Sequence, residues 1–134
     1  MENLNYAVVQ VVHNFGAVAV VGGAVCALYS GATAALRHKL AWLVGFGWAA
    51  QIISGIGFAA VSYYYYDQFP DIHDIAMAAL LIKMLCAAFG VSLVIIYLRY
   101  SATLAIERRH LIWLLLAALG ITALTAAAFL RWFS

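Results

Sequence analysis

The sequence predicts an all-α integral membrane protein, an up-and-down bundle of four helices that forms one domain over residues 1–134. The chain is 68% hydrophobic and only 9% charged, with a mean hydropathy of +1.02, far outside the composition of soluble globular domains. It contains four apolar runs, each long enough for a bilayer span of about 20 residues. Short connections between these runs make consecutive helices antiparallel neighbours.

The predicted helices extend over residues 6–29, 40–65, 75–98 and 111–133. The first follows MENLN, which lacks the basic residues of a signal peptide, so we expect it to remain as the first helix. Between the second and third lies an outer turn that contains Pro70, the only proline. The fourth is rich in small and β-branched residues, a surface suited to packing on protein or lipid.

Charged residues predict the orientation of the bundle. The two connections predicted to lie inside are basic and carry Arg37, Lys39, Arg99, Arg108 and Arg109, whereas the connection between the second and third helices carries Asp67, Asp71 and Asp74. Because basic loops stay on the cytoplasmic side, we expect both termini outside, in a bacterial inner (cytoplasmic) membrane. The net charge of +2 follows from this asymmetry and indicates no nucleic-acid partner.

Small residues predict how the first two helices meet, since membrane helices associate through close packing at such residues. They recur at intervals of four in both segments, as Ala19, Gly23, Ala27 and Gly31 in the first and Gly47, Gln51, Gly55 and Ala59 in the second. Gln51 is the strongly polar member of its stripe. An amide there favours a hydrogen bond across the helix interface over a ligand-binding role.

Two ionisable side chains, His13 and Lys83, lie well inside the predicted spans. At a rise of about 1.5 Å per residue, His13 lies roughly 10 Å and Lys83 roughly 12 Å inside the hydrocarbon from the outer face. Snorkelling of the lysine and a structural histidine are the alternatives. Because intramembrane ionisable residues usually face the bundle interior and mark a function, the shared level favours a common site.

A histidine and a lysine at one depth suit axial ligation of haem iron. Neutral imidazole is a common haem ligand, and a neutral lysine amine can serve as a second ligand. An ammonium could instead pair with a haem propionate. We expect Gly16, Ala17 and Gly23 to leave room for a flat macrocycle between the first and third helices.

The segment VHNFGAVAVVGG resembles the His-x-x-x-Ala…Gly-Gly signature of the copper-resistance D-type membrane domain and of the HemJ-type protoporphyrinogen oxidases. LLIKMLCAAFG is similar to their Leu-Lys-Leu segment, and QIISGIGF to their Thr/Ser-Gly motif, here Ser54 and Gly55. The resemblance implies haem b bound by His13 and Lys83, with Gln51 or Ser54 lining the deeper side of the pocket.

The chain departs from that family at two places. Val20 stands where the family often has tryptophan, and residues 111–133 lack the Asn-Glu-x-Pro element of the HemJ-type enzymes. The expectation carried over is therefore haem binding with a redox or electron-transfer role. Whether the chain is an enzyme stays open.

A copper site is an alternative on the third helix. At about 100° per residue, His73, Met77 and Met84 fall within roughly 40° of one another, and imidazole and thioether suit Cu(I). Lys83 points about 100° away from this stripe. Copper transport or homeostasis is therefore a rival function, although methionine in an apolar helix is most often a packing residue.

A third alternative is a non-catalytic accessory subunit of a larger membrane complex. A bundle that carries stripes of small residues and few candidate site residues is typical of such a subunit. The partners expected from the sequence are the lipid bilayer, a quinone or another redox partner, and a second copy of the chain or the other subunits of a complex.

Overall fold

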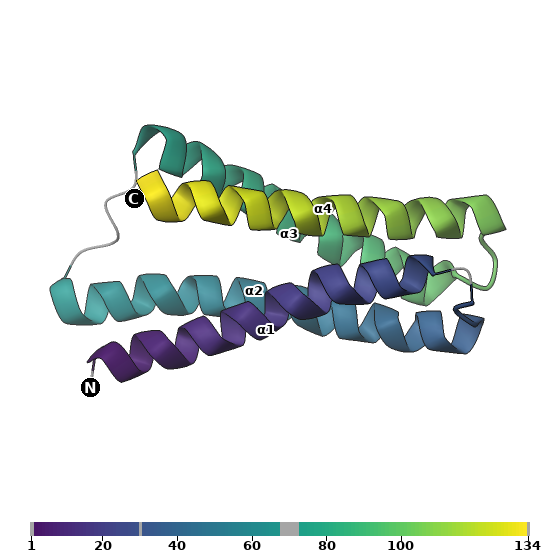
Figure 1. Cartoon of the computed structure of the whole chain (residues 1–134), viewed down its shortest axis with the longest axis horizontal. Coiled ribbons are helices and arrows are strands. Elements are labelled where there is room, and N and C mark those ends of the chain that lie inside the picture. The colour runs from purple at the N-terminus through teal and green to yellow at the C-terminus, as the bar shows by residue number, and fades with distance from the viewer. Residues whose placement is uncertain (1, 30, 68–72, 134) are drawn as a thin grey trace.

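The computed structural model describes residues 2–29, 31–67 and 73–133 and contains four helices. They are α1 (Glu2–Leu28), α2 (Ala34–Tyr66), α3 (Asp74–Tyr100) and α4 (Ile106–Phe133), shown in Figure 1. Each is long and apolar enough to cross a membrane. The prediction of an all-α chain with four span-length helices is confirmed.

The helices form a bundle in which neighbours in sequence are neighbours in space. α1 packs against α2 and α4, and α3 packs against α4 and α2, so that α1 and α3 lie diagonally opposite, with no close backbone contact between them in the described residues. In Figure 1, α1 begins and α4 ends at the same end of the bundle. We call this the acidic end, because Asp67 and Asp74 lie there, and the opposite end, with Arg37 and Arg109, the basic end.

All four helices extend beyond the predicted apolar runs. The hydroxyl of Thr33 caps α2 by accepting a hydrogen bond from Leu36 N at 3.1 Å, so Arg37 and Lys39 belong to the first turns of α2 and not to a loop. Arg109 lies likewise in the first turn of α4. A hydropathy boundary stops at the first charged residue, whereas arginine and lysine are good helix formers and allow the helix to continue.

At the acidic end, α2 stops at Asp67, which takes the left-handed conformation with φ of 52° and donates its N–H to the carbonyl of Tyr63. Aspartate tolerates this conformation better than most residues. The predicted turn at Pro70 and Asp71 lies outside the described residues.

The apolar core occupies the half of the bundle nearer the basic end. Its largest fully buried side chains are those of Trp48, Trp113, Leu116 and Val44. Toward the acidic end the pairs α1–α2 and α3–α4 separate, as Figure 1 shows. Within residues 3–15 of α1 and 55–67, the end of α2, no described side chain is buried. Tight packing of all four helices therefore stops near His13.

Part of the predicted stripe does bring α1 and α2 together, through Gly23, Gly47 and Gln51, and Gly16, which lies outside the stripe, adds to this contact. A Cβ added to Gly16 would lie 3.0 Å from the carbonyl oxygen of Gly47, and one added to Gly23 would lie 2.7 Å from a Val44 methyl group. A Cβ added to Gly55 would meet nothing within 4 Å, so the prediction that Gly55 lies in this interface is wrong. A strict interval of four drifts around a helix of 3.6 residues per turn, and real contacts alternate between three and four.

Candidate functional site

His13 lies on α1 where the tightly packed part of the bundle ends. Its ring is half-buried and packs edge-on against Phe58 of α2, with the ring centroids 5.7 Å apart. One turn deeper on α2, the buried hydroxyl of Ser54 lies 2.7 Å from His13 Nδ1. Two contacts from α2 therefore fix the plane of the imidazole.

The hydrogen bonds of Ser54 determine which ring nitrogen of His13 carries the proton. Ser54 Oγ lies 2.5 Å from the carbonyl of Ala50 and 3.2 Å from that of Gln51, so its single proton is donated to a backbone oxygen. Toward His13, Oγ must then accept, and Nδ1 carries the hydrogen. In this neutral tautomer, Nε2 presents a lone pair on the side of the ring away from Ser54.

Lys83 supplies the partner of that lone pair. Its Nζ atom lies 2.9 Å from His13 Nε2, although Lys83 belongs to α3, the helix diagonal to α1. The long side chain crosses the bundle where the helix pairs begin to separate. Among the described residues, no carboxylate forms an ion pair with Lys83. The structure thus brings together the two ionisable residues that the sequence places at one level.

Gln51 also acts on His13, through the backbone. Its Nε2 donates a hydrogen bond to the His13 carbonyl oxygen, which joins α2 to α1 beside the imidazole. This is the bond across the helix interface that the polar member of the small-residue stripe indicates. Gln51 thereby positions the turn of α1 that carries His13, and its predicted contact with a cofactor stays a prediction.

Gly16 and Ala17, the remaining residues of the predicted haem site, lie one turn from His13. Gly16 is buried against Gly47, Ala50 and the Gln51 side chain, all on α2. The space beside Gly16 is therefore filled by α2. The prediction that this space opens between α1 and α3 is wrong for Gly16. The space beside Gly23 is filled in the same way by the side chain of Val44. Ala17 is half-buried, and its role stays a prediction.

The packing of the bundle changes on the acidic-end side of His13. There α1 and α2 have no buried residues among those described, while Ala76 and Ala79 are buried near the start of α3. The two helix pairs thus pack internally but not tightly on each other at this level. The donor set fits haem b, because Nε2 has a lone pair directed into the bundle and axial ligation needs only one or two protein nitrogens.

The residues of the alternative copper site lie elsewhere. Met77 and Met84 are 44% and 60% exposed on the outside of α3, and His73 is exposed at the start of that helix. Lys83, by contrast, is half-buried and reaches inward. The two hypotheses do use different faces of α3.

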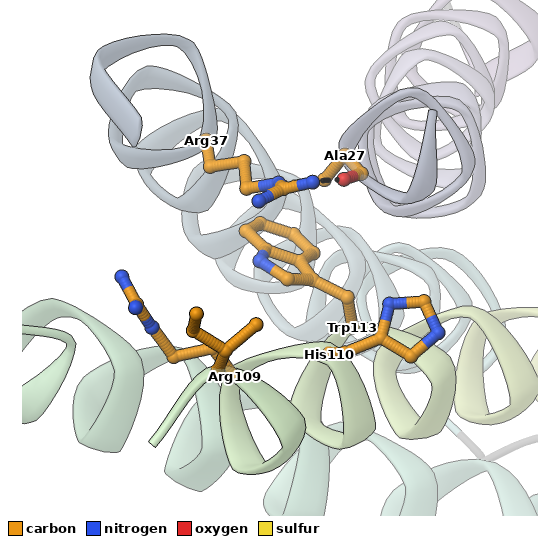
Figure 2. A pocket seen from close by; sticks show the side chains of 6 residues that line it. Ala27, Arg37, Arg109, His110 and Trp113 are labelled. Carbon is orange, nitrogen blue, oxygen red and sulfur yellow. Dashed lines mark hydrogen bonds between the residues drawn. The ribbon is translucent and has the colours of Figure 1, made fainter. Parts of the chain in front are cut away.

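A second polar region, at the basic end, was not recognised from the sequence as a site. A cavity of about 250 Å³ is lined by Ala27 of α1, Arg37 of α2, and Ile106, Arg109, His110 and Trp113 of α4. Figure 2 shows Arg37 reaching from α2 toward the carbonyl of Ala27, the Trp113 indole beneath it, and Arg109 and His110 to either side. From the sequence these basic residues are interfacial charges. The spacing of four between Arg109 and Trp113, which places both on one face of a helix, is the available signal.

No protein-family model, curated protein or solved structure matches this chain. The resemblance to the copper-resistance D-type and HemJ-type proteins rests on the motifs around His13, Ser54 and Lys83.

Proposed function

We propose that this chain is an integral membrane haem b protein with a redox or electron-transfer role, held in a bacterial inner membrane with both termini outside. The observation that carries the proposal is the position of His13 Nε2, which faces the bundle interior with the Lys83 amine 2.9 Å away. Ionisable residues that face the interior of an apolar membrane bundle usually mark a functional site.

The contacts behind His13 support a metal-binding role. Histidine ligands usually donate their second ring N–H to a fixed acceptor, which sets the tautomer and raises the basicity of the coordinating nitrogen. Ser54 is this acceptor, and it is itself fixed by its bond to the carbonyl of Ala50. Gln51 holds the backbone of the same turn.

Lys83 takes one of two roles in this proposal. Nε2 has one lone pair, so binding of iron by His13 replaces the hydrogen bond from Lys83. The freed lysine, whose flexible stem already spans the bundle, then serves either as the second ligand in its neutral form or as the partner of a propionate in its charged form. Both roles keep the amine near the level of His13.

A bound haem would supply one-electron chemistry near the acidic end of the bundle. The residues of the chain would bind it, fix its histidine and shield it from the basic end, where the core is closed by Trp48 and Trp113. The partner in electron transfer would be a quinone in the membrane or a redox protein outside.

The absorption spectrum and metal content of the full chain test this proposal. The protein is produced in a bacterial host supplied with a haem precursor and purified in a mild non-ionic detergent. We expect a Soret band and about one iron per chain. A colourless protein with bound copper would overturn the proposal in favour of copper handling, and a colourless, metal-free protein would overturn it in favour of an accessory subunit.

A further inference from the structure

We propose that the cavity at the basic end binds a phosphate group between α1, α2 and α4. It is lined by two guanidinium groups, an imidazole and an indole, from Arg37, Arg109, His110 and Trp113, and by no acidic side chain. The cavity is separate from the His13 site, so this proposal does not depend on haem binding.

Arg37 is held in place by the chain itself. Its Nε donates a hydrogen bond to the carbonyl of Ala27 at 3.0 Å, in the last turn of α1, where helix carbonyls lack partners within the helix. This bond fixes the guanidinium at the cavity (Figure 2). In the described part of the chain no bond uses its two Nη groups, which remain for a ligand.

The cavity also contains two buried donors without acceptors. Arg109 Nε and Trp113 Nε1 are buried and have no hydrogen-bond partner in the described chain. Only one other buried side-chain nitrogen or oxygen, Trp48 Nε1 in the core, shares this condition among the described residues. Buried donors are nearly always satisfied in folded proteins, so two of them beside one cavity indicate a missing acceptor.

The charge and shape of that acceptor follow from the donors. Two arginines offer several N–H groups in planar forks, which match the oxygens of a phosphate. Ile106, which begins α4, also lines the cavity, and Ala105, which precedes it, has no side chain that can cap the first N–H groups of the helix. Glu107 is exposed and forms no ion pair with either arginine in the described residues.

A phosphate group can reach this cavity as the headgroup of an anionic phospholipid or as free phosphate. The basic end is where the headgroups of a cytoplasmic leaflet would lie, and basic pockets between membrane helices bind such headgroups. Both sources present the same oxygens to the same donors, and an experiment with two arms distinguishes them.

The test titrates the full chain, in a non-ionic detergent at fixed salt, with short-chain phosphatidylglycerol in one arm and inorganic phosphate in the other. Binding is followed by broadening of the ³¹P resonance. We expect saturable binding in at least one arm. Saturation only with the lipid identifies a headgroup site, and saturation with both identifies a site open to free phosphate.

Matched variants separate a built site from general charge attraction. Arg109→Gln should weaken binding roughly tenfold or more, because it removes a charge-assisted donor, whereas Arg108→Gln, an identical charge change on an exposed neighbour, should change binding less than about twofold. Trp113→Phe, which removes only the indole donor, should weaken binding severalfold with the charge intact. Equal losses for Arg108→Gln and Arg109→Gln, or no saturable binding in either arm, would overturn the proposal.

Discussion

His13 Nε2 lies 2.9 Å from Lys83 Nζ, although the helices that carry them are diagonal in the bundle and their backbones do not meet in the described residues. The contact is possible because a lysine stem is long enough to cross the bundle where α1–α2 and α3–α4 separate. It joins the two helix pairs through a polar bond at a level where apolar packing between them is ending. The bond therefore links the two helix pairs, and its two residues are the ones proposed to hold haem.

His13→Ala should abolish the haem spectrum. The substitution removes Nε2, the proposed axial ligand, and leaves Ser54 and Lys83 without their partner. Absorption spectra and haem content per chain measure the result. His38→Ala is the control, because that histidine is exposed at the opposite end of the bundle. A His13→Ala protein with full haem content and an unchanged spectrum would make His13 a structural hydrogen-bonding residue.

Lys83→Met should shift the haem spectrum or weaken haem retention without abolishing binding. Methionine keeps most of the apolar stem and removes the amine, so His13 remains available to iron. A change in the ligand-sensitive bands of the spectrum indicates a coordinated lysine. Faster haem loss with unchanged bands indicates a propionate partner. A variant identical to the wild type in both spectrum and haem loss would exclude Lys83 from the site.

Ser54→Ala should weaken haem binding about tenfold, because the loss of a group that orients a histidine ligand has effects of that size. It also leaves the His13 Nδ1–H unpaired, which should lower the free energy of unfolding by about 1–3 kcal/mol. Ser92→Ala is a close control. Ser92 is exposed and donates to the carbonyl four residues earlier, at 2.8 Å from Ala88, as Ser54 does to Ala50, but it has no histidine partner. If the two substitutions had equal effects on haem binding and stability, Ser54 would not be a residue that orients His13.

The fold could be predicted because hydropathy and helix length largely determine it in a chain this apolar. His13 and Lys83 could be found as well, since ionisable side chains stand out inside apolar segments. The diagonal placement of α1 and α3 could not be predicted from the sequence. Short connections establish which helices are antiparallel, but not which helices face each other across the bundle.

Other features were hidden by ambiguity in the sequence. Gly16 and Gly55 are both glycines, yet α2 fills the space beside Gly16 whereas Gly55 faces open space. The two cases differ only in how each helix is rotated about its axis, which the sequence does not give. The role of Ser54 was suggested by resemblance alone, because a serine in an apolar run usually bonds its own backbone. Arg37 and Arg109 matched the pattern of interfacial charges, and the cavity between them depends on how far α2 and α4 extend past the apolar runs.

Membrane orientation follows from the unequal charge of the two ends. Arg37 and Arg109 lie at the basic end with other basic residues, and we expect this end in the cytoplasm. Alkaline phosphatase fused after Ser134 should be active in a bacterial host, because the fusion point would lie outside. The same enzyme inserted at Thr103, in the connection between α3 and α4, should be inactive. The reverse pattern would invert the proposed topology and place the His13 site near the cytoplasm.

Close packing between α2 and α3 should depend on Gly90. A Cβ added there would overlap the indole of Trp48, which is 1% exposed and cannot move without disturbing the core. We expect Gly90→Ala to lower the free energy of unfolding by about 1–3 kcal/mol, the usual cost of overpacking. Unfolding in mixtures of ionic and non-ionic detergent measures the change. Gly22→Ala is the control, since a Cβ there meets nothing within 4 Å and alanine is the better helix former, so this variant should be unchanged or slightly more stable. If both variants had the same stability, the contact between Gly90 and Trp48 would not hold α2 and α3 together.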